Sequence, residues 1–243
     1  MMQRRQKPDP ATFIGSGKVQ ELRDAVQASG ADTVICDGEL APSQLRNLED
    51  RVGVKVVDRT ALILDIFAQH AKSAEGKTQV EMAQLTYQMQ RLRGWGGNLS
   101  RQAGGQAAGG EGIGGRGPGE TKLETARRRI QARLTKLRRE AAELAAHRET
   151  RKAQRRRNNI PSVVLAGYTN AGKSSLLNQL TDAGVMIEDA LFATLSPTTR
   201  RTHTSDGRVY TVSDTVGFVR HLPHQLVEAF QSTLEEVAEA DLI

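Results

Sequence analysis

Along the first 75 residues, apolar positions alternate between the spacing of helices and the spacing of strands. Val19, Leu22 and Val26 fall on one helical face, and Gly30 is typical of a helix end. Further helices are predicted from Pro42 to Gly53 and over residues 60–71, and strands over residues 10–14, 33–36 and 54–57. Strands that alternate with helices favour a parallel sheet, so residues 1–75 are predicted to form a small parallel α/β N-terminal domain.

Residues 76–158 carry two apolar seams at helical spacing. Met82, Leu85, Met89 and Leu92 are three, four and three residues apart, which predicts a narrow seam on one helix. A second, near-heptad seam consists of Leu123, Ile130, Leu134, Leu137, Ala141 and Leu144. Two helices with matching seams most simply pack against each other, so this region is predicted to be an antiparallel helical hairpin.

A glycine-rich loop, residues 94–119, joins the two helices and holds about half of the chain's 23 glycines. Thr121 and Glu124 form a capping box that predicts the start of the second helix just after this loop. Structureless loops of this length are uncommon in compact domains, and those that occur are mostly functional or disordered. The region also carries a group of candidate RNA contacts, six arginines and one aromatic ring: Arg93, Trp95, Arg101, Arg116, Arg127, Arg128 and Arg129. Arginines follow phosphates and a ring stacks on bases, although a flexible linker beside a solvated helix would share this composition.

The pattern over residues 159–243 predicts part of a third, α/β domain. Residues 162–166 are typical of a buried parallel strand, and residues 175–180 have helical spacing with Gly184 after them. Asp206 and Gly207 form a hairpin-turn dipeptide between predicted strands at 201–204 and 208–212. An amphipathic helix is predicted over residues 223–240, and another strand would begin at residue 241.

The segment between the predicted strand and helix reads GYTNAGKS, which fits the phosphate-loop pattern G-x-x-x-x-G-K-[ST]. The candidate nucleotide contacts here are Gly167, Tyr168, Thr169, Asn170, Ala171, Gly172, Lys173, Ser174 and Ser175. The glycines let consecutive backbone N–H groups converge on phosphate oxygens, and the helix dipole adds to the attraction. Lys173 would reach the β- and γ-phosphates, and the Ser174 hydroxyl would bind the Mg²⁺ that bridges them.

Gly15-Ser16-Gly17-Lys18 imitates a phosphate loop in the first domain. It lacks the four-residue gap before its G-K pair, and Val19 stands where Ser or Thr is required. We interpret this sequence as a turn that leads into a helix.

Two later segments complete a GTPase-like site. The first is a Thr-rich stretch whose hydroxyls are candidates for the Mg²⁺ shell, as in switch I: Phe192, Ala193, Thr194, Leu195 and Ser196, followed by Thr198 and Thr199. The second is a D-x-x-G sequence at a predicted strand end: Asp214, Thr215, Val216 and Gly217. Asp214 would hold Mg²⁺ indirectly, and the Gly217 N–H would meet the γ-phosphate. Phe218 stands where Ras-like proteins have the Gln that orients the attacking water, so slow hydrolysis that a partner accelerates is expected.

Composition narrows the class of protein. The net charge of +6 and its clustering favour a polyanionic partner. No apolar run is long enough to span a bilayer, and no apolar segment of a signal peptide follows the first residues. Cys36 is the single cysteine, which suits a cytoplasmic protein, and its apolar surroundings favour a small buried thiol rather than a nucleophile. The five histidines show no metal-ligand spacing with it.

Four segments together closely resemble the HflX family of translational GTPases: GYTNAGKS at 167–174, FATL at 192–195, DTVGF at 214–218 and GGRGPGETKLE at 114–124. The resemblance covers nearly the whole chain and implies an α/β N-terminal domain, a helical hairpin and a G domain that continues past residue 243. It implies GTP as substrate, Mg²⁺ as cofactor, and a role on the large ribosomal subunit and its rRNA in splitting or rescuing stalled ribosomes. By the family's motif, Ser174 and Thr194 match the Mg²⁺ ligands, and Lys173, Thr194 and Gly217 match catalytic positions. Ser196 departs from the family, which usually has Asp there.

The sequence alone leaves other functions open. The chain contains no N-K-x-D sequence, the motif that reads guanine. An RNA-binding module with a nucleotide-controlled switch, or a P-loop ATPase with an incidental basic face, would share the features above. The expectation is a monomeric, cytoplasmic GTPase.

Overall fold

The structure is a computed structural model that describes residue 2 and residues 7–92, 118–181, 192, 194–195, 197–219 and 234–243. It is a mixed α/β fold with two compact units. One unit consists of Met1–Ile63 and Tyr87–Gln131, and the other of Leu64–Thr86 and Ala132–Ile243. In the described part of the chain, no helix is both long enough and apolar enough to cross a membrane.

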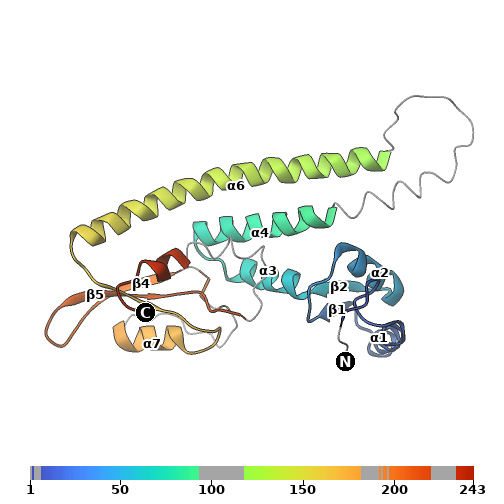
Figure 1. Cartoon of the computed structure of the whole chain (residues 1–243), viewed down its shortest axis with the longest axis horizontal. Coiled ribbons are helices and arrows are strands. Elements are labelled where there is room, and N and C mark those ends of the chain that lie inside the picture. The colour runs from blue at the N-terminus through green and yellow to red at the C-terminus, as the bar shows by residue number, and fades with distance from the viewer. Residues whose placement is uncertain are drawn as a thin grey trace, which may run out of the picture. The chain divides into compact units, whose positions relative to one another are not determined.

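The first unit contains a two-stranded parallel sheet, as the alternating pattern predicts (Figure 1). Its elements are α1 (Ser16–Ser29), β1 (Thr33–Cys36), α2 (Pro42–Val52) and β2 (Lys55–Asp58), after which α3 (Arg59–His70) begins. Val19, Val26, Leu48, Val52 and Val56 form its buried core. Gly30 and Gly53 end the two helices with φ of 66° and 80°, a conformation that glycine adopts without steric cost. The sequence at 15–18 is a helix start, as interpreted, because α1 begins at Ser16.

The prediction of a strand at residues 10–14 is wrong. Asp9 and Phe13 form an isolated antiparallel bridge, and the residues between them turn back on themselves. The Asp9 carboxylate accepts hydrogen bonds from the backbone N–H groups of Ala11 (2.9 Å) and Thr12 (3.2 Å). An aspartate that satisfies backbone donors two and three residues later favours a turn over an extended chain.

Asp58, at the end of β2, is only 1% exposed, and its buried carboxylate accepts several hydrogen bonds within this unit. Oδ1 accepts hydrogen bonds from the Ala61 N–H (2.9 Å), at the start of α3, and from the Tyr87 hydroxyl (2.6 Å). Oδ2 accepts from the Leu40 N–H (3.4 Å) and from the Arg91 guanidinium (2.5 Å). Burial and this carboxylate raise the pKa of Tyr87. Both oxygens are therefore satisfied by the protein itself.

Helices α4 (Ala74–Leu92) and α6 (Pro118–Arg157) pack side by side as the predicted antiparallel hairpin (Figure 1). Glu81 of α4 pairs with Arg133 of α6 at 2.7 Å, and Glu75, earlier on α4, pairs with Arg148, later on α6. The order of the pairs shows that the helices run in opposite directions. Leu134 and Leu137 of the predicted second seam are buried, at 2% and 1% exposure.

Two details of the hairpin differ from the prediction. On α4, Val80 and Ala83 are fully buried, whereas Met82, Leu85 and Met89 are only half-buried. The apolar spacing identifies a face of the helix, but α4 has neighbours on more than one side. Helix α6 begins at Pro118, so Thr121 lies inside its first turn and is not the residue that caps it. Proline at a helix start loses no hydrogen bond, which allows this earlier beginning.

The last part of the chain is a three-stranded sheet in the order β3-β5-β4. Strand β3 (Ser162–Leu165) pairs in parallel with β5 (Val209–Asp214), and β4 (Thr198–His203) pairs with β5 in antiparallel. Helix α7 (Lys173–Thr181) follows β3. The predicted hairpin turn is present, with Gly207 at φ 83°. On the other side of β3, Leu242 bridges Val163 in parallel, where the sequence predicts another strand. Most of the helix predicted at 223–240 lies outside the described residues.

Candidate nucleotide-binding site

The predicted phosphate loop joins the end of β3 to the start of α7. Gly172 has φ 84° and Asn170 has φ 56°, so the chain passes twice through the left-handed region. Helix α7 begins at Lys173, directly after the second glycine. The loop therefore ends at a helix N-terminus, where backbone N–H groups without intrahelical partners attract an anion.

The loop is fastened to the segment that follows β5. The Phe218 N–H donates to the Gly167 carbonyl (2.9 Å), and the Thr169 N–H donates to the Phe218 carbonyl (3.1 Å). At Gly217 the two backbones approach so closely that a Cβ would lie 2.5 Å from the Thr169 Cα. Only glycine fits there, and this close contact explains why the D-x-x-G sequence ends in glycine.

Three predicted metal-shell residues meet at one point. The Ser174 hydroxyl lies 2.5 Å from Asp214 Oδ2, and the Thr194 hydroxyl lies 2.9 Å from the same oxygen. The two hydroxyls are 3.1 Å apart. Ser174 lies in the first turn of α7, Thr194 in the Thr-rich segment and Asp214 at the end of β5. The fold therefore brings together residues that are far apart in the sequence.

The Asp214 carboxylate has an incomplete set of partners. The residue is 0% exposed, and its Oδ1 atom is buried with no hydrogen-bond partner among the described residues. An orphaned carboxylate oxygen in a protein interior is costly, because it has lost its water and gained nothing in return. Hydroxyl and carboxylate oxygens are the ligands that Mg²⁺ prefers, so this donor set fits a hydrated magnesium ion.

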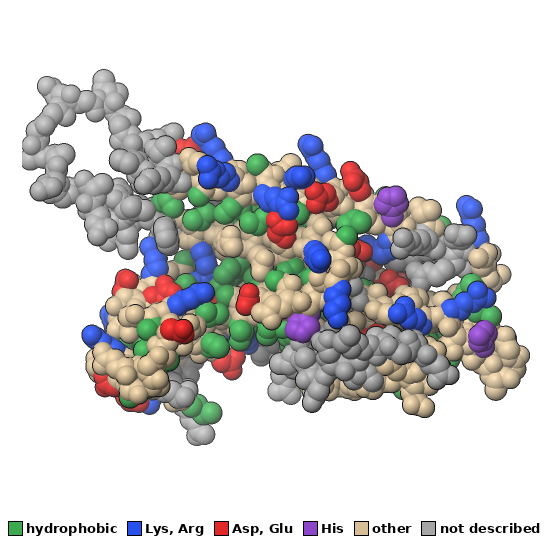
Figure 2. Space-filling model, turned by 180° about the vertical axis from the view of Figure 1, so that it is seen from behind, with side chains coloured by type: hydrophobic (Ala, Val, Ile, Leu, Met, Phe, Trp, Pro, Cys, Tyr) green, Lys and Arg blue, Asp and Glu red, His purple; other side chains and the backbone are tan. Residues whose placement is uncertain are grey.

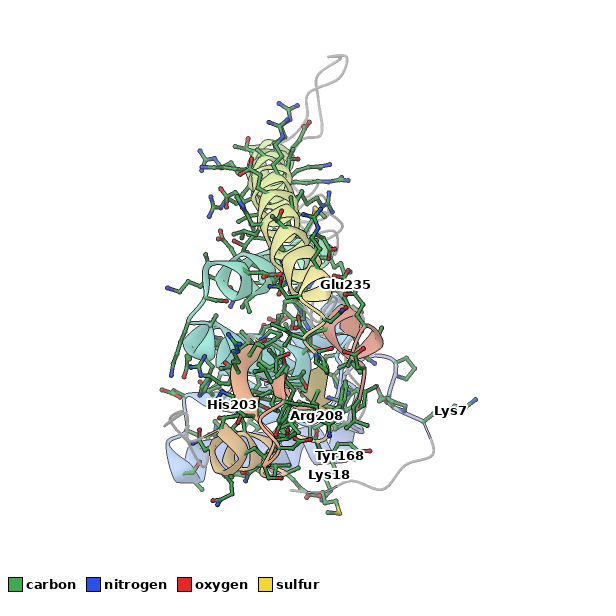
Figure 3. The ribbon with its side chains drawn as sticks, turned by 90° about the vertical axis from the view of Figure 1, so that its left-hand side faces the viewer. Lys7, Lys18, Tyr168, His203, Arg208 and Glu235 are labelled. Carbon is green, nitrogen blue, oxygen red and sulfur yellow. The ribbon has the colours of Figure 1, made fainter. Side chains whose placement is uncertain are left out.

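Lys173 lies at the same loop. Its ammonium donates a hydrogen bond to the Tyr168 carbonyl at 2.8 Å. Burial lowers the pKa of Lys173, and the charge of Asp214 opposes that shift. A phosphate group beside the ammonium would favour the charged form further. Tyr168, labelled in Figure 3, is 62% exposed, so its side chain leaves the loop open to solvent.

The other predicted nucleotide contacts fall into two groups. Ser175, Asn170 and Ala171 are exposed, and Leu195 is half-exposed. Thr215 and Val216 are 0% and 1% exposed, and the Thr215 hydroxyl donates to the Leu165 carbonyl (2.7 Å). These two side chains serve the interior, so only their backbone is available to a ligand. Ala193 and Ser196 lie outside the described residues.

Of the predicted RNA contacts, Arg127, Arg128 and Arg129 are exposed on α6. Arg128 pairs with Glu124 at 2.6 Å, while its side chain is 76% exposed. Figure 2 shows Lys and Arg side chains along α6 with acidic side chains between them, so the surface is basic but mixed. The remaining predicted contacts lie outside the described residues: Arg93, Trp95, Arg101 and Arg116.

Two sets of contacts in the same unit were not predicted from the sequence. Phe67 of α3 packs against Phe192, two residues before Thr194. Arg148 joins Glu75 to Glu235, which lies beside the end of α6 in Figure 3. Apolar spacing within one helix does not indicate which distant residue Phe67 contacts, and no local pattern indicates ion pairs between distant segments. Among the described residues, no three His, Cys, Asp or Glu side chains gather as metal ligands.

Comparison with protein families divides the chain into three matched segments. Residues 1–68 match the family described as GTP-binding GTPase N-terminal, and residues 70–155 match the GTP-binding GTPase Middle Region. Residues 162–243 match the 50S ribosome-binding GTPase family.

Individual relatives match along the whole chain. The GTPase HflX of Caldanaerobacter subterraneus subsp. tengcongensis is 53% identical over 243 residues, covering 100% of this chain and 55% of its own length. The GTPase HflX of Lacrimispora saccharolytica is 50% identical, covering 100% of this chain and 56% of its own length. The GTPase HflX of Escherichia coli is 49% identical, covering 98% of this chain and 54% of its own length. The chain thus spans about half the length of these relatives.

A solved structure has a similar fold. The crystal structure of the SsGBP–GDP complex matches with a TM-score of 0.52 and 28% identity, covering 98% of this chain and 61% of that one. The three family segments, the full-length matches and the phosphate loop fastened to a D-x-x-G sequence agree with one another. The chain belongs to the HflX family of GTPases.

Proposed function

We propose that this chain carries the phosphate- and magnesium-binding part of a GTPase that acts on the large ribosomal subunit. The observation that carries the proposal is the buried Asp214 carboxylate, whose Oδ2 atom is shared by the hydroxyls of Ser174 and Thr194 while Oδ1 has no partner among the described residues. The names of the matched relatives and of the matched 50S ribosome-binding family support it.

In this function each residue of the site has a separate task. Lys173 contributes a positive charge to the β- and γ-phosphates, and the backbone N–H groups of the loop hold their oxygens. Ser174 and Thr194 are the residues that would hold Mg²⁺ directly, and Asp214 would hold it through water. An Mg²⁺ ion held there would supply positive charge that offsets the negative charge developing as the γ-phosphate leaves. The Gly217 N–H would meet the γ-phosphate.

Phe218 bears on the rate of hydrolysis. Its aromatic ring cannot orient a water molecule as the Gln of Ras-like proteins does. The proposal therefore includes slow hydrolysis by the protein alone and acceleration by the ribosome.

The remaining parts of the chain would serve binding. We assign residues 1–75 to an N-terminal domain, 76–158 to a hairpin with a glycine-rich tip, and 159–243 to part of a G domain. The basic hairpin and its tip would contact rRNA, and the protein would split or rescue stalled ribosomes as a cytoplasmic monomer. The exposed Arg127, Arg128 and Arg129 support RNA contact, because cations on an open helix face can reach phosphates.

The nucleotide part of this proposal is tested by titration of the chain with a fluorescent GTP analogue. Lys173→Ala should weaken binding at least about tenfold, since it removes the side-chain cation of the loop. Lys18→Ala is the matched control, because Lys18 also follows a glycine at a helix start but pairs with Glu21 at 2.5 Å. Equal affinity of both variants would reject the site.

Competition with ATP tests base selection. Because the chain contains no N-K-x-D sequence, it should bind GTP and ATP with similar, weak affinity. Tight, guanine-selective binding by these 243 residues would mean that other residues read the base.

The ribosomal part is tested by co-sedimentation with large subunits at increasing salt. Replacing Arg127, Arg128 and Arg129 with Gln should weaken binding and flatten its dependence on salt. The control, Arg23, Arg51 and Lys55 to Gln, removes the same charge from the N-terminal domain. If both triple variants bind equally well, the hairpin is not the contact.

A further inference from the structure

Phe192 has an unfavourable backbone conformation. Its φ is 61°, a left-handed value that is uncommon for a residue with a bulky side chain. Such a conformation persists only where the surroundings determine it, and such positions gather at functional sites. Phe192 is also only 4% exposed, although it belongs to the Thr-rich segment and not to a helix or strand. Its ring must therefore be held by something specific.

The holding contact comes from α3. The rings of Phe192 and Phe67 pack edge to face, with centroids 4.6 Å apart and planes at 86°. Phe67 is 0% exposed, Leu64 lies one turn earlier on the same helix at 2%, and Ala71, the first residue after the helix, is 6% exposed. An edge-to-face pair has a preferred geometry, so Phe67 fixes both the place and the tilt of the Phe192 ring.

Phe192 lies two residues before Thr194, one of the proposed metal-shell residues. Two residues of extended chain span at most about 7 Å, so the position of Phe192 limits where Thr194 can lie. Thr194 reaches Asp214 Oδ2 at 2.9 Å and Ser174 at 3.1 Å. Neither of those partners restrains the backbone before Thr194, whereas the ring pair does.

We propose that Phe67 is a positioning residue for the magnesium site, acting through the Phe192 ring to hold the Thr194 hydroxyl beside Ser174 and Asp214. The inference rests on the proposed function of that site. Phe67 lies in α3, before the hairpin and outside the segment that matches the 50S ribosome-binding GTPase family. The site thus depends on a residue about a hundred positions before the phosphate loop. By linkage, binding that fixes Thr194 also favours the Phe67–Phe192 contact.

The test is the Mg²⁺ dependence of binding of a fluorescent, non-hydrolysable GTP analogue to the full chain. Phe67→Ala should weaken binding in Mg²⁺ about three- to tenfold, the range expected from loss of one ring pair, and leave binding in EDTA unchanged. Phe67→Leu, which keeps apolar volume without a ring edge, should fall between. Leu137→Ala is the control, because Leu137 is equally buried in α6, at 1% exposure, but is not part of the ring pair.

A double-mutant cycle decides between positioning and plain core packing. If Phe67 acts through Phe192, the effects of Phe67→Ala and Phe192→Ala on the Mg²⁺ dependence are not additive. Additive effects, or equal loss in EDTA and Mg²⁺, would overturn the proposal. If Phe67→Ala does not fold, the cycle is built with Phe67→Leu and Phe192→Leu. Lys173→Ala is run alongside, because its failure to weaken binding would reject the nucleotide site itself, whereas a silent Phe67 variant beside an effective Lys173→Ala rejects only this inference.

Discussion

Two buried aspartates occupy equivalent places in the two units of the molecule. Asp58 ends β2 and Asp214 ends β5, each strand has a parallel neighbour, and the residues are 1% and 0% exposed. Parallel strands with following helices place such residues at the edge where ligands commonly bind. Their position and burial therefore do not distinguish them.

Their partners do distinguish them. The protein supplies Asp58 with a guanidinium, a hydroxyl and two backbone N–H groups, shared between both oxygens. Asp214 receives two hydroxyl contacts, both at Oδ2, and Oδ1 has none among the described residues. A buried carboxylate whose charge is matched by the protein supports the fold, and one that is left short of partners favours an outside cation. The comparison teaches that unmet hydrogen-bonding capacity, and not burial, marks the functional residue.

The largest expected effect on stability comes from removing the negative charge at each of the two positions. Asp58→Asn should lower the free energy of unfolding by about 3 kcal/mol or more, because Arg91 is left buried without its counter-charge. Asp214→Asn should change it by less than about 1 kcal/mol, since no salt bridge joins Asp214 to a cation in the described part of the chain. Urea unfolding measures both.

Nucleotide binding gives the converse result. Asp214→Asn should abolish the Mg²⁺ dependence of GTP-analogue binding, and Asp58→Asn, assayed in stabilising conditions, should keep it. The comparison fails if both variants lose stability to the same extent, or if Mg²⁺ dependence survives in Asp214→Asn.

A smaller effect is expected at the two glycine-rich sequences. Gly217→Ala places a methyl group 2.5 Å from the Thr169 backbone and should cost about 1–3 kcal/mol of stability, together with weaker nucleotide binding. Gly17→Ala is the matched control, because its Cβ meets nothing within 4 Å in the first turn of α1. It should be neutral or stabilise by up to about 1 kcal/mol. Thermal unfolding that ranks the two variants in the opposite order would contradict the assignment of the close contact.

The smallest effect concerns Glu81, a carboxylate that is both partnered and solvated. A hydrogen bond from Arg133 lowers the pKa of Glu81. For an acid with a lowered pKa, the added stability is complete above the ordinary glutamate pKa, about 4, and is lost as the pH falls through the lowered value. Arg133→Gln should therefore lower the melting temperature slightly at neutral pH and not at all in strong acid. Lys136→Gln, whose contact with Glu140 is 3.9 Å, should do less at every pH.

The sequence predicted the phosphate loop and most elements because both follow from local rules. The loop is a contiguous pattern, and α1, α2 and β2 follow from apolar spacing with Gly30 and Gly53 as stops. The prediction of a strand at 10–14 was wrong because the Asp9 side chain stabilises a turn there, which apolar spacing does not indicate. Phe67, Asp58 and Arg148 act through contacts with residues far along the chain, which spacing within a single segment does not encode.

The hydrogen bonds that join Phe218 to Gly167 and to Thr169 have a consequence for the speed of binding. They order the loop backbone during folding, so the entropy of ordering it does not oppose the arrival of a nucleotide. A loop that is already shaped needs no search for its bound form, which favours an association rate set by diffusion and electrostatic attraction. In such a site the lifetime of the complex, and not the rate of encounter, distinguishes a triphosphate from a diphosphate.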